Sequence, residues 1–96
     1  MTLDEFKASV ASGDMPSDLS NALQGLWIEA GGNWDTAHEA VQSDDGREAA
    51  WVHAYLHRKE PDESNARYWY KRSGEPFFDG SFEAEWDAIA RALLAA

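Results

Sequence analysis

Cysteine is absent from this chain of 96 residues. The absence excludes a disulfide framework, a thiol nucleophile, a zinc ribbon and a cysteine-ligated cluster. The aromatic and aliphatic content predicts a core that is sufficient without disulfides.

Positive charge is scarce as well. The chain has 8 Lys and Arg against 18 Asp and Glu, which gives a formal net charge of −10. Proteins that bind nucleic acid without sequence preference neutralise phosphates with cations, and anionic membranes attract basic segments. We therefore expect no nucleic-acid partner and no membrane partner.

Long apolar runs are also missing. No run approaches the ~20 apolar residues that span a bilayer. Residues 1–7 lack the basic and apolar regions of a signal peptide. These features predict a cytoplasmic location.

Signatures of catalysis are missing too. Gly31 and Gly32 lack the flanking strand and the Lys of a phosphate-binding loop. There is no Gly-x-Ser-x-Gly motif. The 18 carboxylates form so many possible pairs that no pair is informative. We expect a non-catalytic protein without a cofactor.

Aromatic residues, in contrast, are plentiful. The chain has five Trp, three Tyr and four Phe, and 44% of its residues are hydrophobic. A large aromatic ring buries about 150–250 Å² on folding, so this composition disfavours disorder. We predict one domain over residues 1–96.

The apolar spacing predicts an all-α fold. Apolar residues recur at intervals of three and four, and no useful segment alternates with period two. A capping box at residues 2–5 starts the first helix, which Gly13 ends. We expect later helices to be capped by Ser17 or Asp18, Asn33, Ser43 or Asp44, Asp62, and Ser81, with Pro61 and Gly74 ending the fourth and fifth. Trp34, Trp51, Trp69 and Trp86 are predicted in the core, with Trp27 at its edge.

Two segments align when the sequence is shifted by 29 residues. Leu23, Trp27, Asn33 and Ala37 then fall on Val52, Leu56, Asp62 and Ala66. Each segment predicts a helix, a sharp turn with a capping residue, and a second helix with an inward Ala. We predict two stacked antiparallel hairpins, over 18–43 and 44–74, with an N-terminal helix and a capping helix over 81–96 that cover their open faces.

The turn Gly32-Asn33-Trp34-Asp35-Thr36-Ala37 resembles the start of the second helix in a tetratricopeptide repeat, and residues 61–66 form a more divergent copy. The resemblance covers about residues 18–74, with a period of 29 residues where that family has about 34. It implies a protein or peptide partner. Residues 50–60 and 65–70 also resemble a run in a group of short uncharacterised bacterial proteins, and that resemblance implies no function.

The resemblance also implies where a partner would bind. In tetratricopeptide proteins, one face of the first helix of each hairpin lines a peptide groove. On this face Arg47, Ala50, Ala54, His57 and Arg58 lie together, and Asn21 and Gly25 occupy the matching positions of the first hairpin. Such a face could hold an acidic or carboxylate group through charge-assisted hydrogen bonds.

Charge balance offers another explanation of these cations. Six of the eight basic residues lie between positions 47 and 72, where only four acidic residues lie. Cations in this segment could simply pair with acidic neighbours in the fold. Both interpretations stay open at this point.

Histidine spacing suggests an alternative function. His53 and His57 are four residues apart on one predicted helix, so their imidazoles could share a metal ion, with His38 as a third ligand. The alternative is a metal-binding protein or a small enzyme that uses these three residues. An ordinary explanation is that His53 and His57 flank the core stripe.

Two apolar residues fall outside the predicted core faces. Ile28 lies opposite the Leu stripe of its helix, and Tyr68 lies outside the inward arc of the fifth helix. They either pack against the first helix or a loop, or mark a patch for a partner or a second copy of the chain. The protein is thus expected to be a monomer or a homodimer.

Overall fold

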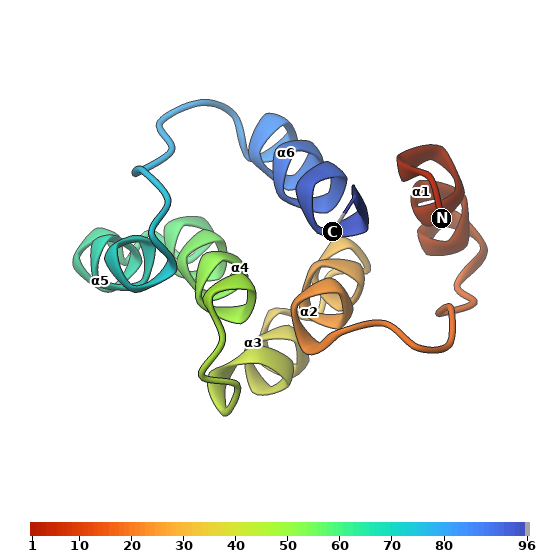
Figure 1. Ribbon diagram of the computed structural model, residues 1–96, viewed down its shortest axis with the longest axis horizontal. Coiled ribbons are helices and arrows are strands. Elements are labelled where there is room, and N and C mark those ends of the chain that lie inside the picture. Colours follow the sequence, from red (N-terminus) through yellow and green to blue (C-terminus); the bar gives the residue numbers. More distant parts are fainter. Residues whose placement is uncertain (96) are drawn as a thin grey trace.

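The computed structural model describes residues 1–95, which form six helices and no strand (Figure 1). The predicted all-α fold is confirmed. The helices are α1 (Leu3–Ser12), α2 (Asn21–Ala30), α3 (Trp34–Gln42), α4 (Arg47–Lys59), α5 (Glu63–Ser73) and α6 (Phe82–Ala95).

Most helix ends follow the predicted capping chemistry. The side chains of Asn33, Asp62 and Ser81 accept hydrogen bonds from the backbone N–H groups three residues on, at 3.1, 3.4 and 3.1 Å. Gly13 and Gly74 end α1 and α5 with φ of 81°, a left-handed conformation that glycine adopts without strain.

Two predicted helix starts are wrong. Ser17 and Asp18 do not cap α2, because Asp18 adopts a positive φ of 66° and Ser20 accepts the hydrogen bond from Leu23 N–H. Helix α4 begins later than Ser43 or Asp44, at a Gly46 cap with no side-chain hydrogen bond. The Asp44 carboxylate accepts from Gly46 N–H instead, and so holds the preceding turn.

Helices α2 and α3 pack as one pair and α4 and α5 as another, with α4 also touching α2, α3 and α6. Figure 1 shows α4 between α5 and the remaining helices, with α1 lying outside α6. Ala37 and Ala66, the inward alanines of the two aligned segments, are both fully buried. No helix within residues 1–95 combines the length and the apolar character that crossing a bilayer requires.

The core is centred on α4 and extends into α1, α2 and α6. Phe6, Leu26, Leu56 and Ile89 are fully buried there. A Cβ at Gly25 would lie 2.8 Å from Val41 Cγ1 and 3.2 Å from Val52 Cγ1. Glycine at this position therefore sets how closely α2 approaches α3 and α4.

We predict that Gly25→Ala lowers the free energy of unfolding by about 1–3 kcal/mol, because the overpacking of α2 against two valines outweighs the higher helix propensity of Ala. Urea unfolding followed by circular dichroism measures the change.

Gly31→Ala is the matched control. Gly31 has an ordinary φ of −81°, and a Cβ there would meet only Ile28 O at 3.4 Å. This variant should unfold at the wild-type urea concentration or above it. Equal destabilisation by both substitutions would show that the approach of α2 does not depend on Gly25.

Candidate functional site

The three histidines of the chain converge at the junction of the two hairpins. His38 comes from α3, and His53 and His57 come from successive turns of α4. His38 Nε2 lies 2.9 Å from His53 Nε2, and one ring nitrogen from each histidine lies within 4.8 Å of the others. We call this group the histidine cluster. The structure thus brings together the three residues that the spacing had suggested as metal ligands.

Two tryptophans from different helices stack on rings of the cluster. Trp34 stacks on His38 with ring centroids 4.9 Å apart, and Trp69 stacks on His53 with centroids 3.8 Å apart. Trp34 is itself fixed by a 2.7 Å hydrogen bond from its Nε1 to Leu56 O. These stacks restrict rotation of both imidazoles, so their nitrogens keep their directions.

Two of the three histidines are held in the neutral form. His53 is 4% exposed and His57 is 7% exposed. Burial, followed by the repulsion of His38 and His57, lowers the pKa of His53 to about 3. Burial and the repulsion of His57 also lower the pKa of His38. The lone pairs of His38 and His53 are therefore free of added protons at neutral pH.

Two nitrogens of the cluster differ in how they are satisfied. His57 Nδ1 lies 2.6 Å from Glu60 Oε1, which leaves its Nε2 for the other rings. His53 Nδ1 is buried without a hydrogen-bond partner among the described residues. One proton has to be shared between His38 Nε2 and His53 Nε2, because one ring must donate and the other accept. The metal-free arrangement is thus incompletely satisfied.

A second group of ligand atoms adjoins the cluster. Ring and carboxylate atoms of His57, Glu60 and Asp62 also lie within 4.8 Å of one another. Asp62 already accepts hydrogen bonds from Asn65 N and Asn65 Nδ2 as the cap of α5. We therefore assign Glu60 to the orientation of His57 and Asp62 to the helix cap.

The proposed peptide-binding face is divided between different environments. Arg47 is exposed at the start of α4, whereas Ala54 is 0% exposed and packs with Ala66 and Tyr70. His57 belongs to the histidine cluster. This face is covered by α5 rather than by the N-terminal helix, so the described residues do not form one open groove along it. Binding of a peptide at this face stays a prediction.

Arg58 is engaged inside the protein. Its Nε donates to Glu85 Oε1 at 2.9 Å, and the other oxygen of this fully buried carboxylate accepts from the Tyr70 hydroxyl. Burial raises the pKa of Glu85, and hydrogen bonds and the charge of Arg58 act against that rise. The guanidinium also lies 4.4 Å from the Phe82 ring centroid. Arg58 therefore compensates a buried charge.

The remaining predicted binding residues lie apart from one another. Asn21 donates through Nδ2 to Asp44 Oδ2 at 3.0 Å, at the start of α2. Tyr68 is 52% exposed on α5 and accepts a 3.3 Å hydrogen bond from Arg72. Ile28 is half-buried and packs against the core.

The predicted tryptophan core needs correction. Only Trp86 is buried, and Trp34, Trp51 and Trp69 are half-buried. The rings of Trp34 on α3 and Trp69 on α5 stack on histidines instead of filling the centre of the core. Trp27 lies at the edge, as predicted, with its Nε1 donating to Ser9 Oγ at 3.0 Å.

We predict that Arg58→Ala lowers the free energy of unfolding by about 2–3 kcal/mol, because it leaves the Glu85 carboxyl buried without its cation. Arg91→Ala, at an exposed position of α6, is the control and should change it by less than about 0.5 kcal/mol. Adding Glu85→Gln to Arg58→Ala should recover part of the loss. Equal urea midpoints for the two Ala variants would contradict this role of Arg58.

We predict that the metal-free protein gains stability as pH rises from 3 to 6.5. The pKa of His53 is about 3 in the folded protein against an ordinary 6.5, so in this window the unfolded chain binds a proton that the folded protein does not. Each such proton contributes a slope of up to about 1.4 kcal/mol per pH unit. Urea unfolding of the wild type and of His53→Phe at several pH values gives the difference. A difference between the two proteins that stays constant from pH 4 to 6.5 would contradict the low pKa.

Comparison with protein-family models, with curated proteins and with solved structures finds no match to this chain. What the histidine cluster does has to follow from its own ligand atoms, burial and charge.

Proposed function

We propose that this protein binds a divalent first-row transition metal ion, with Zn²⁺ as the reference ion, at the histidine cluster. The observation that carries the proposal is the convergence of one ring nitrogen from each of His38, His53 and His57 within 4.8 Å. Imidazole is a preferred ligand of Zn²⁺, Cu²⁺ and Ni²⁺, whereas Ca²⁺ and Mg²⁺ prefer oxygen.

The distance between two of the three rings is close to that of a metal site. Zn–N bonds of about 2.0–2.1 Å in tetrahedral geometry place two ligand nitrogens about 3.3 Å apart. His38 Nε2 and His53 Nε2 are 2.9 Å apart, so they would separate by only a few tenths of an ångström. A metal ion would take the place of the proton shared between these two atoms.

The surroundings also suit a metal ion. Glu60 Oε1 at 2.6 Å from His57 Nδ1 is the carboxylate that commonly orients a metal-bound histidine. The stacked rings of Trp34 and Trp69 supply rigidity and a dry surrounding. Lowered pKa values keep His38 and His53 neutral, so binding needs no prior loss of an added proton there.

The proposed role of the metal is to join the two hairpins. One ligand comes from α3 of the first pair and two come from α4 of the second. An ion that binds the folded protein alone stabilises it by RT ln(1 + [metal]/Kd), which is about 2.7 kcal/mol at 100 times Kd. Three protein ligands leave a fourth position for water or another small ligand. We propose this function without catalysis; the cytoplasmic location and a protein partner stay predictions.

We predict that untagged protein, treated with chelator, binds one Zn²⁺ per chain and that its thermal midpoint rises with added Zn²⁺. His53→Phe should weaken binding at least about 100-fold, because it removes a ligand but keeps the ring that stacks on Trp69. Glu60→Gln should weaken it about tenfold through loss of the charge that orients His57. Isothermal titration calorimetry, with Co²⁺ absorption as a report of geometry, measures these effects.

Glu39→Gln is the matched control, because Glu39 is an exposed carboxylate next to His38 in the sequence. It should bind Zn²⁺ as the wild type does. A wild-type midpoint that neither Zn²⁺ nor Ni²⁺ moves, or binding that survives in both His53→Phe and His38→Phe, would refute the site.

A further inference from the structure

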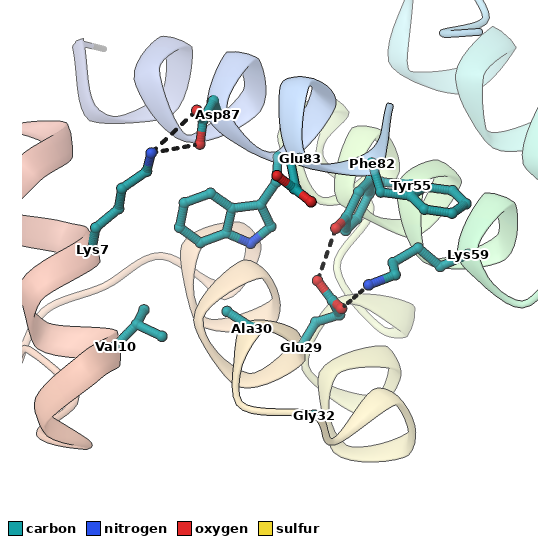
Figure 2. Close-up of a pocket in the computed structure, with 11 residues that line it drawn as sticks. Lys7, Val10, Glu29, Ala30, Gly32, Tyr55, Lys59, Phe82, Glu83 and Asp87 are labelled. Atoms are coloured by element: carbon teal, nitrogen blue, oxygen red, sulfur yellow. Dashed lines mark hydrogen bonds and ion pairs between the residues drawn. The ribbon is translucent and has the colours of Figure 1, made fainter. Parts of the chain in front are cut away.

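A second candidate site lies on the other side of α4. Residues two apart on a helix point about 160° from each other, so Tyr55 faces away from both His53 and His57. It lines a cavity of about 530 Å³ where α1, α6 and the ends of α2 and α4 meet (Figure 2). Cavities of roughly 300–1,000 Å³ are the usual size for small-molecule sites.

The walls of this cavity are aromatic and aliphatic. Tyr55, Phe82 and Trp86 supply rings, and Val10 and Ala30 supply aliphatic surface. Figure 2 shows Val10 on one side of the cavity and the Tyr55 and Phe82 rings on the other. The cavity therefore offers an apolar ligand body a set of flat surfaces.

The charged groups of the cavity are mostly acidic. Lys7 pairs with Asp87 at 3.0 Å, and Lys59 pairs with Glu29 at 2.7 Å. Glu83 also lines the cavity and forms no ion pair among the described residues. One negative charge is thus left over at the rim, in a chain whose net charge of −10 attracts cations from a distance.

One end of the cavity already holds a cation that belongs to the protein itself. The Lys59 ammonium lies between the Glu29 carboxylate and two rings, 5.5 Å from the Phe82 centroid and 6.0 Å from the Tyr55 centroid. The Glu29 carboxylate also accepts a 2.9 Å hydrogen bond from the Tyr55 hydroxyl (Figure 2). A carboxylate combined with ring faces is the arrangement that recognises organic ammonium groups.

We propose that this cavity binds a small organic cation, an ammonium group on an apolar body. The ammonium group pairs with Glu83, and the apolar body lies against Trp86 and Val10. An anionic ligand would meet three carboxylates of which two are already paired, and would have to displace one of them from its lysine. This site is independent of the histidine cluster.

Phenethylamine is the probe, with 2-phenylethanol and 3-phenylpropionate as its neutral and anionic counterparts. Two-dimensional ¹H–¹⁵N NMR should show saturable shifts for the amine at amides of α1 and α6, with weaker binding of the alcohol and the weakest binding of the acid. Glu83→Gln should weaken amine binding about fivefold, and Glu83→Lys at least about tenfold. Because Glu83 is exposed, neither change is expected to disturb folding.

Glu39→Gln and His53→Phe are the controls and should leave amine binding unchanged. Binding of the alcohol as tight as that of the amine, tighter binding of the acid, or unchanged affinity in Glu83→Lys would overturn the proposal. Shifts confined to residues outside α1, α6 and the ends of α2 and α4 would overturn it as well.

Discussion

Helix α4 is packed by other helices along most of its length, and its polar side chains must find their partners inside the protein. Eight of its 13 residues are buried, including both of its histidines. A buried polar group without a hydrogen bond costs about 1–3 kcal/mol, so this constraint selects which residues of the neighbouring helices can face α4. Glu29 of α2 meets Tyr55, Glu85 of α6 meets Arg58, and His38 of α3 meets His53.

These three contacts differ in how many of their polar atoms have hydrogen-bond partners. Both oxygens of Glu29 and both oxygens of Glu85 have partners. In the histidine cluster His53 Nδ1 has no partner among the described residues, and beside Glu85 the same holds for Arg58 Nη2. The two carboxylate clusters pair acids with cations and a hydroxyl, whereas the histidine cluster gathers three imidazoles, which is a ligand set that a transition metal ion can use. This difference is why the metal site is the stronger functional proposal.

The sequence predicted local features well and features that depend on packing less well. Asn33, Asp62 and Ser81 start their helices and Gly74 ends one as expected, because capping depends on neighbours within a few residues. Where several caps competed, local rules could not choose: Ser20 displaced Ser17 and Asp18 once the chain turned at the latter. The sequence interpretation named Ser17 and Asp18 but not Ser20, and the helix begins beyond the turn at Asp18, which has a positive φ.

In the candidate site, too, the sequence predicted what lies within one helix and missed what depends on packing between helices. The spacing of His53 and His57 on one helix was enough to place them side by side, but the position of His38 depended on how α3 packs against α4. The roles of Trp34 and Trp69 were missed, since a ring that covers histidines and a ring that fills a core have the same periodicity. Glu85 could not be singled out as the partner of Arg58, because 18 carboxylates were available and only the fold identifies the buried one.

Charge links the two sides of α4. The segment from 47 to 72 is basic in sequence, but two of its cations are taken up by acids from other helices, Lys59 by Glu29 and Arg58 by Glu85. This pairing is the internal charge balance that the sequence had offered as the alternative to a carboxylate-binding face. Beside α1 and α6, Lys7 pairs with Asp87 and Lys59 with Glu29, so Glu83 is the carboxylate of the cavity without an ion pair among the described residues. The pairing of Arg58 with Glu85 therefore argues against an anionic ligand at Arg58, and the unpaired Glu83 supports the proposal of a cationic ligand at the cavity.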